Sequence, residues 1–213
     1  MTLTFISESF VLYPAMKPGS SGNPIPRPFT RRWRALAGAL AAGAFLVVLP
    51  AYAATYWTVP GVMKSFFSSS KRVTFKRVTL PEATAAEIAK KLGASSLKRE
   101  WVIYLGETDG RLDGYAIVDD EKGMHEPIDF AVRFTPKGAV DRVEVMVYRE
   151  PYGDEVRSDR FRAQFQGKTA GDPITAGKDI DIVSGATISS RSMALGVKRD
   201  ALILQTALKN GSL

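Results

Sequence analysis

Hydrophobic and polar residues alternate through the middle of the chain in a way that predicts two β-hairpins. In the first, residues 101–105 and 114–118 are rich in Val, Ile and Tyr, and Asp109-Gly110 between them is typical of a tight turn. In the second, residues 128–134 and 140–148 flank a Thr-Pro-Lys-Gly connection. Valine occupies positions 143, 145 and 147 of the last strand, so the pattern predicts that one face of this strand is buried.

Spacings of three and four residues predict helices on both sides of these hairpins. A short helix is expected from Pro81, with Thr79 as a possible cap, and it should end at Gly93. A second helix is expected over residues 158–165 and a long one over residues 189–208. The long helix repeats apolar residues every three or four positions: Met193, Val197, Ala201, Leu204 and Leu208. The order of elements indicates an α+β fold, with a twisted antiparallel sheet of hairpins packed against a long C-terminal helix.

The first 57 residues differ in composition from the rest of the chain. Residues 1–30 are rich in Pro, Gly and Ser without an apolar period, so we expect a disordered extension. Residues 31–57 resemble a signal peptide, because three arginines precede an uncharged run and Ala51-Tyr52-Ala53 offers a cleavage site. The uncharged stretch continues to Met63, which is also long enough for a retained membrane anchor. Both alternatives export residues 58–213 as the functional domain, since the arginines stay in the cytoplasm.

Charge and the rarest residue types exclude several classes of function. The chain has a formal net charge of +7, but residues 1–53 carry five basic side chains and one acidic one. The rest of the chain has 24 basic and 21 acidic side chains, and this near balance gives no support for a nucleic-acid partner. There is no cysteine and the single histidine is His125, so iron–sulfur clusters and thiol catalysis are excluded and no metal site is expected.

The segment before the C-terminal helix has the composition of an anion-binding turn. It reads Asp-Ile-Val-Ser-Gly-Ala-Thr-Ile-Ser over residues 181–189. Gly185 and Ala186 carry little side chain and let a large group approach the backbone, and Thr187 supplies a hydroxyl for modification. A phosphate at Thr187 would face the unpaired amides and the positive end of the helix that follows. From the pattern alone, an ordinary turn with a Ser or Thr helix cap explains the same residues.

The same nine residues resemble the flavinylation motif of the FMN-binding domain family, which includes the NqrC and RnfG subunits of electron-transport complexes. In this family a flavin transferase outside the membrane moves FMN from FAD to the threonine of the motif. The resemblance covers roughly residues 112–208 and implies covalent FMN at Thr187, with Ser184, Gly185 and Ala186 close to its phosphate. Ser184 either bonds to the phosphate or caps the turn.

The resemblance also implies a contact between the flavin ring and the loop after the second hairpin. Glu150, Tyr152 and Gly153 are expected beside the isoalloxazine ring, where Tyr152 could stack on it. The alternatives are a solvated carboxylate for Glu150 and a position at the edge of the core for Tyr152. The loop reads Arg-Glu-Pro-Tyr-Gly-Asp-Glu, whereas NqrC and RnfG usually carry Glu-Thr-Pro-Gly-Leu-Gly, so a stand-alone relative of those subunits is expected. His125 is expected to be structural or solvated.

These features predict an extracytoplasmic electron-transfer flavoprotein that carries FMN on Thr187 and acts as an electron carrier more than as a stand-alone enzyme. Its expected partners are a flavin transferase for maturation and a membrane-associated redox donor and acceptor. The alternative is an exported binding or assembly module with the same fold and no redox role. A hydrolase is disfavoured, because His125 has no motif partner in the sequence.

Overall fold

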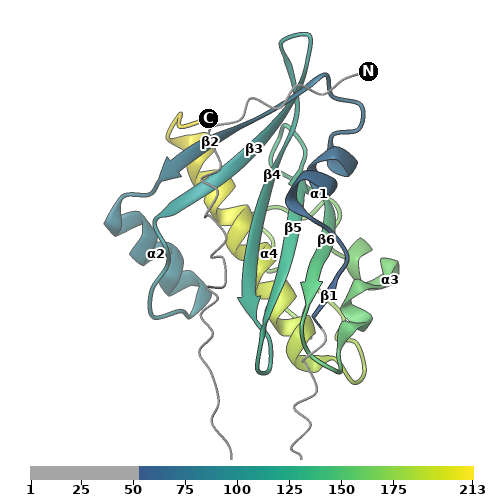
Figure 1. Cartoon of the computed structure of the whole chain (residues 1–213). Helices are drawn as coiled ribbons and strands as arrows, with labels where there is room; N and C mark the ends of the chain where they lie inside the picture. Colours follow the sequence, from purple (N-terminus) through teal and green to yellow (C-terminus); the bar gives the residue numbers. More distant parts are fainter. Residues whose placement is uncertain (1–52) are drawn as a thin grey trace, which may run out of the picture. The chain divides into compact units, whose positions relative to one another are not determined.

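The computed structural model describes residues 53–213. Their centre is a six-stranded antiparallel sheet with the strand order β1-β6-β5-β4-β3-β2 (Figure 1). The strands are β1 (Ala54–Thr55), β2 (Arg72–Thr79), β3 (Glu100–Thr108), β4 (Arg111–Lys122), β5 (Pro127–Phe134) and β6 (Val140–Tyr148). The predicted fold class, a twisted antiparallel sheet with a long C-terminal helix, is confirmed.

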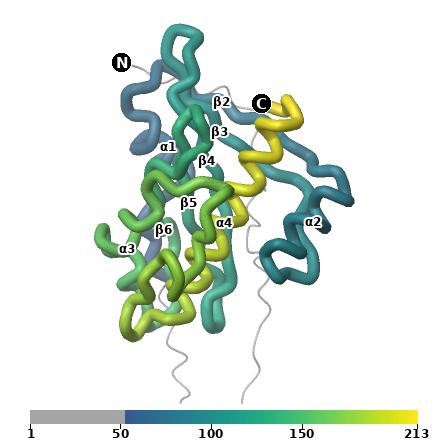
Figure 2. The backbone as a smooth tube through the Cα atoms, turned by 180° about the vertical axis from the view of Figure 1, so that it is seen from behind, coloured from purple at the N-terminus to yellow at the C-terminus, as the bar shows by residue number. Residues whose placement is uncertain are grey.

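Helices cover both faces of the sheet. They are α1 (Val59–Phe66), α2 (Glu82–Leu92), the short 3₁₀ segment η1 (Asp154–Arg157), α3 (Asp159–Ala163) and α4 (Thr187–Lys209). α4 crosses one face and α1 lies on the other, as Figures 1 and 2 show from opposite sides. The main cluster of buried side chains joins the sheet to α4 and includes Phe130 and Val197. A smaller cluster on the α1 side includes Met63 and Ala131.

Both predicted hairpins are confirmed; the strands of the first are longer than predicted, and those of the second agree with the prediction to within one residue. Between β3 and β4, Asp109 and Gly110 have φ angles of 52° and 78°. Left-handed angles at both central positions define a type I′ turn, the turn that an Asp-Gly pair favours. β1, β2 and α1 were not predicted. β2 escapes sequence analysis because most of its side chains are exposed, which leaves no clear alternation of apolar and polar residues.

The structure confirms that one face of β6 is buried, and it shows that the opposite face is buried in part as well. Val143 and Val145 face the main cluster, but a register shift in the pairing with β5 turns Val147 toward the α1 side. Met146 beside it is buried as well, because α1 covers this face. The shift returns Tyr148 to the main cluster. A bulge of this kind re-aims the side chains that follow it, and here it directs Tyr148 toward the start of α4.

The helix predictions are confirmed except at some of their ends. α2 ends at Gly93, which has the left-handed φ of 68° expected of a C-terminal glycine. Thr79 does not cap α2, and this prediction was wrong: Thr79 is the last residue of β2, and Pro81 occupies the N-cap position. α3 is shorter than predicted and is capped by the side chain of Ser158. α4 begins two residues earlier than predicted, at Thr187.

The first described residues already belong to the globular domain. β1 pairs with β6, with Ala54 opposite Tyr148. Val62 and Met63 of α1 are buried in the smaller cluster, so the end of the long uncharged stretch is part of the core. The predicted N-terminal extension and most of the predicted signal peptide or anchor lie outside the described residues. Within residues 53–213, none of the helices is long and apolar enough to cross a membrane.

Candidate flavin site

Three segments meet at the end of the sheet where β4 and β6 finish. Glu150, in the loop after β6, accepts hydrogen bonds from the backbone amides of His125 and Glu126 in the β4–β5 turn, the second at 3.1 Å. Ser192 of α4 donates to the carbonyl of Lys122, the last residue of β4, at 2.6 Å. The loop, the turn and the start of α4 are therefore held together by hydrogen bonds between segments that are far apart in the sequence.

Tyr148 connects the loop to the helix. Its hydroxyl lies 2.6 Å from the carbonyl of Tyr152 and 2.8 Å from the hydroxyl of Ser189. Because a carbonyl only accepts, Tyr148 donates to Tyr152 and Ser189 donates to Tyr148. Burial raises the pKa of Tyr148, which keeps the phenol protonated and able to donate. Gly153 lies directly against this pair, since a Cβ at this position would be 2.5 Å from Tyr148 Oη and 2.7 Å from Ser189 Oγ.

A tight turn brings Thr187 to the start of α4. The amide of Ala186 donates to the carbonyl of Val183 at 3.0 Å, and Gly185 between them has a φ of 82°. This positive angle favours glycine, so Gly185 has a conformational role in addition to offering space. Ser190 Oγ accepts a hydrogen bond from the amide of Val183 at 3.1 Å and thereby fixes the turn to the helix. Thr187 is the first residue of α4, and it is exposed.

The start of α4 has the electrostatic character of an anion site. Ala186 occupies the N-cap position, and among the described residues no side chain caps the helix. None of the residues in this first turn, all of them described, is acidic. The first amides of α4 therefore keep the positive potential of a helix end without a side-chain acceptor. Ser184 and Thr187 are both exposed here, so a phosphate on Thr187 fits the residues present.

Three buried serines of α4 belong to this region and were not predicted from the sequence. Ser189, Ser190 and Ser192 are at most 7% exposed. Each hydroxyl bonds to a different element: the phenol at the end of β6, the motif turn and the end of β4. Together they fix the rotation of the helix, which leaves Thr187 on the outside. The serine run after the motif threonine was visible in the sequence, but serines on a helix are usually exposed.

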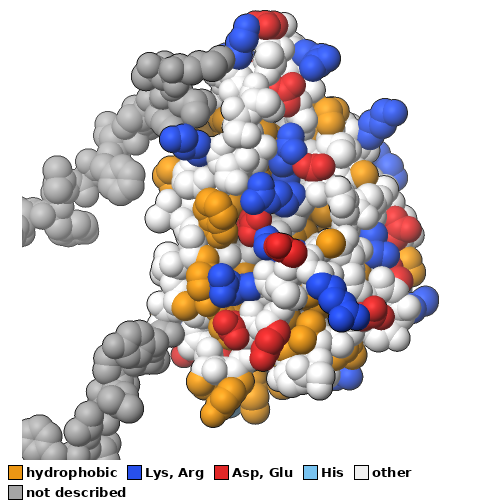
Figure 3. Space-filling view, turned by 90° about the vertical axis from the view of Figure 1, so that its right-hand side faces the viewer, with side chains coloured by type: hydrophobic (Ala, Val, Ile, Leu, Met, Phe, Trp, Pro, Cys, Tyr) orange, Lys and Arg blue, Asp and Glu red, His pale blue; other side chains and the backbone are white. Residues whose placement is uncertain are grey.

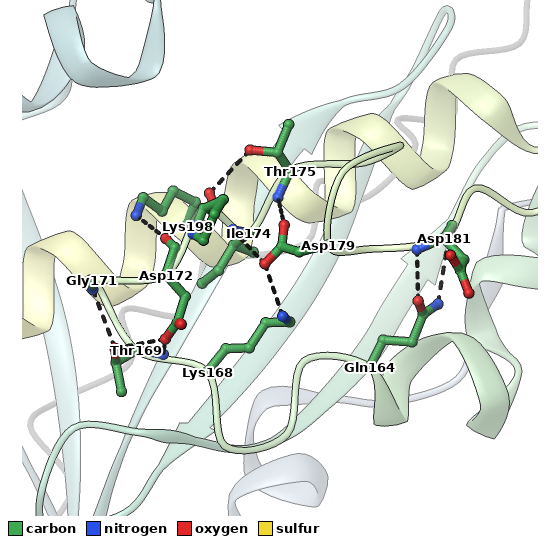
Figure 4. A network of polar contacts seen from close by, with 11 residues as sticks. Gln164, Lys168, Thr169, Gly171, Asp172, Ile174, Thr175, Asp179, Asp181 and Lys198 are labelled. Atoms are coloured by element: carbon green, nitrogen blue, oxygen red, sulfur yellow. Dashed lines mark hydrogen bonds and ion pairs between the residues drawn. The ribbon is translucent and has the colours of Figure 1, made fainter.

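The loop that leads into the motif is held by its own polar contacts (Figure 4). Gln164, at the end of α3, accepts a hydrogen bond from the amide of Asp181 at 2.6 Å. Asp179 accepts from Lys168 at 2.8 Å and from the amide of Thr175 at 2.7 Å. Burial alone would raise the pKa of Asp179, but these hydrogen bonds hold it below its usual value. The motif therefore follows a loop of defined conformation.

The residues that the resemblance implies lie on these three segments, with very different exposure. Tyr152 is 82% exposed, so its ring is available to a ligand and does not form part of the core. Glu150 is half-buried, and its carboxylate fixes the β4–β5 turn rather than being fully solvated. Gly153 is buried against Tyr148, and the side chain of His125 is exposed.

This end of the molecule matches the model of a known protein family. Residues 123–201 match the model of the FMN-binding domain. The matched residues begin in the β4–β5 turn, include the loop after β6 and the motif turn, and end within α4. The matched range therefore contains all three segments that meet around Thr187.

Two proteins from other organisms are similar to part of this chain. One is a component of the proton-translocating ferredoxin:NAD(+) oxidoreductase complex of Clostridium ljungdahlii, 30% identical over 118 residues, which are 52% of this chain. The chain spans 62% of the length of that relative. The crystal structure of Shewanella oneidensis NqrC matches 63% of this chain and 80% of its own, with 19% identity and a TM-score of 0.46.

Proposed function

We propose that this protein is an extracytoplasmic electron carrier whose FMN is attached to Thr187 through a phosphoester. The observation that supports this most directly is the position of Thr187: an exposed hydroxyl on the first residue of an uncapped helix, within the FMN-binding domain. Bound FMN would supply one- and two-electron chemistry, while the protein contributes position and electrostatics.

The attachment step requires little of this chain beyond an accessible threonine. The Thr187 hydroxyl would displace AMP at the FMN phosphate of FAD, forming a phosphoester and releasing AMP and the hydroxyl proton. A flavin transferase outside the membrane is the proposed catalyst. The amides at the start of α4 would then hold the phosphate, and Ser184, which is exposed in the preceding turn, would donate a hydrogen bond to it. Gly185 keeps this approach open, since nothing lies within 4 Å of the position of a Cβ there.

The proposed location rests on the leader and on the relatives. The leader has the sequence features of a signal peptide or an anchor, and both direct residues 58–213 outward. The Clostridium relative is part of a ferredoxin:NAD(+) oxidoreductase complex, which is consistent with redox partners at the membrane. The proposed donor and acceptor are therefore membrane-associated proteins or carriers.

The test is to produce the chain with a flavin transferase in an exporting host and to measure its intact mass. The wild-type protein should gain the mass of FMN less one water and fluoresce in a denaturing gel, and peptide mapping should place the addition on Thr187. Thr187→Ala should abolish the covalent flavin, whereas Thr187→Ser keeps a hydroxyl and should retain partial labelling.

Ser184→Ala is the matched control within the motif turn. It leaves the Thr187 hydroxyl in place and should only slow the labelling. Each variant should stay folded, because Thr187 and Ser184 are exposed, and changes to exposed side chains usually alter the free energy of unfolding by less than about 0.5 kcal/mol. Covalent flavin on folded Thr187→Ala would show that the attachment site is wrong. Wild-type protein without flavin, made with a competent transferase, would favour a module without a redox role.

A further inference from the structure

In the described part of the chain, the sheet has one long free edge, the outer side of β2. β2 is the last strand in the order β1-β6-β5-β4-β3-β2, and all eight of its residues pair with β3 without a register shift. It contains neither proline nor a bulge, two of the features that commonly protect an edge strand. The other edge strand, β1, is only two residues long. β2 therefore offers a continuous row of backbone groups to an additional strand.

The hydrogen-bond register identifies which backbone groups of β2 face outward. Directly after β2, the amide of Leu80 donates to the carbonyl of Arg99 at 2.8 Å, and these two residues continue the register of the β2–β3 pairing. Residues that bond to the neighbouring strand alternate in an antiparallel ladder, so Lys76 bonds to β3 as Leu80 does. Phe75 and Arg77 consequently direct their amides and carbonyls away from β3. Among the described residues, none of these outward groups has a hydrogen-bond partner.

An exposed aromatic side chain lies at the centre of this edge. Phe75 is 54% exposed, and its ring centroid lies 6.2 Å from that of Tyr104, its partner on β3. The guanidinium carbon of Arg77 lies 6.0 Å from the centroid of the Phe75 ring. Val102, opposite Arg77, is 37% exposed on the same face of the sheet. Aromatic and arginine side chains carry much of the binding energy of protein interfaces, and a strand beside β2 would remove the Phe75 ring from water.

The charge of this edge selects the chemistry of the strand that would pair with it. β2 carries Arg72, Lys76 and Arg77 and no acidic residue. Arg72 is paired with Glu107 at 2.5 Å, whereas Lys76 and Arg77 form no ion pair with any described residue. Elsewhere the charges are mixed: Figure 3 looks onto the side of the domain that lies on the right in Figure 1, and it shows Lys and Arg side chains interspersed with Asp and Glu. The free edge therefore carries unpaired positive charge that an acidic strand would neutralise.

A second copy of this chain is a poor partner for the same edge. Two β2 strands side by side would bring together two sets of basic side chains without an acidic one. Like charges on neighbouring strands destabilise their pairing, and charged edge strands commonly protect identical chains from association. An acidic extended segment instead gains both the backbone hydrogen bonds and the ion pairs. In this mode of recognition the main-chain bonds give affinity, and the side chains at alternate positions give specificity.

We propose that β2 binds an extended acidic segment of a partner protein as an additional strand, with acidic side chains beside Lys76 and Arg77 and an apolar one beside Phe75. This inference does not depend on the attachment of FMN. β2 and β6 lie near opposite edges of the sheet, and the last residue of β6, Tyr148, contacts the start of α4 (Figures 1 and 2). The segment would therefore hold a partner on the domain and leave the start of α4 uncovered.

The probe for the test is a synthetic peptide with blocked ends, Thr-Glu-Val-Glu-Val-Glu-Thr-Glu, and its control carries Lys in place of each Glu. NMR titration of the protein purified from an exporting host gives the Kd, and amide hydrogen exchange shows where the peptide binds. With the peptide at about ten times the Kd, exchange of the Phe75 and Arg77 amides should slow about tenfold, because the bound fraction is protected. The amides of Thr74 and Lys76, which already bond to β3, should not change.

Two variants of the edge and one control test the side chains. Phe75→Ser and Arg77→Glu should each raise the Kd of the acidic peptide about tenfold, through loss of the aromatic contact and through like-charge repulsion. Lys90→Glu makes the same change of charge on α2, away from the edge, and should leave the Kd within about twofold of the wild-type value. All three variants should unfold at the wild-type temperature, because they alter exposed side chains.

Four outcomes would overturn the proposal. The acidic peptide could fail to bind at millimolar concentration, or it could bind without slowing exchange at Phe75 and Arg77. Equal Kd values for the acidic and the lysine peptide would show that charge does not select the partner. Protection of the same two amides that increases with protein concentration, in the absence of peptide, would assign the edge to a second copy of this chain.

Discussion

The first turns of α4 and the middle of the same helix hold their polar groups in opposite ways. At the start, the hydroxyls of Ser189, Ser190 and Ser192 each have one neutral partner, and Thr187 faces outward. In the middle, Asp200 is fully buried, and neither of its carboxylate oxygens has a hydrogen-bond partner among the described residues. The start of α4 leaves the Thr187 hydroxyl exposed, whereas the middle of α4 concentrates charge inside the fold.

The charged centre lies between α4, β4 and the segment before β3. Asp119 of β4 accepts hydrogen bonds from Lys98 at 2.6 Å and from Arg199 at 2.7 Å. Arg199 also binds Glu121 and the carbonyl of residue 120. Burial raises the pKa of Asp200 well above its usual value, and the nearby Asp119 raises it further. Asp200 is therefore neutral over much of the pH range in which other carboxyls are ionised.

This difference indicates a division of roles along one helix. Charges buried in the centre determine how firmly α4 binds the sheet, while the neutral hydroxyls at its start determine how precisely Thr187 is placed. Mutations in the two regions should therefore separate stability from flavin attachment.

Arg199→Ala should have the largest effect, and it should act on stability. It removes the guanidinium that pairs with Asp119 and Glu121, so buried carboxylates lose their partner at a cost of about 3–5 kcal/mol. Urea unfolding followed by circular dichroism measures this loss. The fraction of folded protein that takes up flavin should stay at the wild-type level.

Arg160→Ala is the control for this prediction, because Arg160 is exposed on α3. It should change the free energy of unfolding by less than about 0.5 kcal/mol. A folded Arg199→Ala protein that cannot be labelled would show that the centre of α4 also positions Thr187, against the proposed division.

Gly153→Ala should affect both stability and labelling. Its φ of 95° already disfavours a side chain, and the new Cβ would collide with the hydroxyls of Tyr148 and Ser189. We expect a loss of about 1–3 kcal/mol in the free energy of unfolding and slower flavin attachment, because the collision separates the loop from α4.

Gly167→Ala is the control for Gly153→Ala, because it introduces similar backbone strain without a collision. Gly167 has a similar φ of 79°, but nothing lies within 4 Å of its Cβ position. It should lose stability through strain alone and label at the wild-type rate. Equal labelling rates in Gly153→Ala and Gly167→Ala would show that the contact between the loop and α4 does not matter for attachment.

Asp200→Asn should change how stability depends on pH. With a raised pKa in the folded state, the proton on Asp200 is kept on folding and lost on unfolding. The resulting stability is fully present below the pKa of the unfolded chain, about 3.9, and decreases by about 1.4 kcal/mol per pH unit until the folded-state pKa is passed. Asparagine has no proton to lose, so the variant should become more stable than the wild type as the pH rises from about 4.

Urea unfolding at several pH values tests this prediction, with Asp119→Asn as the control. Asp119→Asn leaves Lys98 and Arg199 without their carboxylate partner and should destabilise the domain. A constant difference between Asp200→Asn and the wild type across the pH range would mean that Asp200 does not hold its proton in the folded state.

Much of the fold could be predicted from the sequence because its local signals agree with its packing. The Asp-Gly turn indicates the first hairpin, the alternation in β6 indicates the face that packs on the main cluster, and the spacing in α4 indicates its apolar face. β2 and β1 could not be predicted, since the first has mainly exposed side chains and the second is two residues long. The bulge in β6 that re-aims Tyr148 depends on pairing with β5, which alternation within one strand does not reveal.

The sequence could predict only those residues of the candidate site that belong to a recognisable local motif. Thr187 follows from the motif, and Tyr152 from the resemblance of the loop. Ser189 gains its significance from a contact between segments that are far apart in the chain. An acidic residue in a helix, such as Asp200, is ordinarily expected to be exposed. Only the structure shows that Asp200 is buried.

Ser189→Ala should have the smallest effect, and it tests how precisely the start of α4 must be held. The variant removes the hydrogen bond that Ser189 donates to Tyr148, while Tyr148 can still donate to Tyr152, so the loss should be about 0.5–1.5 kcal/mol. Tyr148→Phe should cost more, because it leaves the Ser189 hydroxyl and the Tyr152 carbonyl without their common partner. If these hydroxyls place Thr187, both variants should label more slowly than the wild type, with Tyr148→Phe the slower of the two. Labelling time courses on folded protein measure this order. Wild-type rates in both variants would mean that the motif turn alone positions Thr187 and that the buried serines serve stability, as the charges in the middle of α4 do.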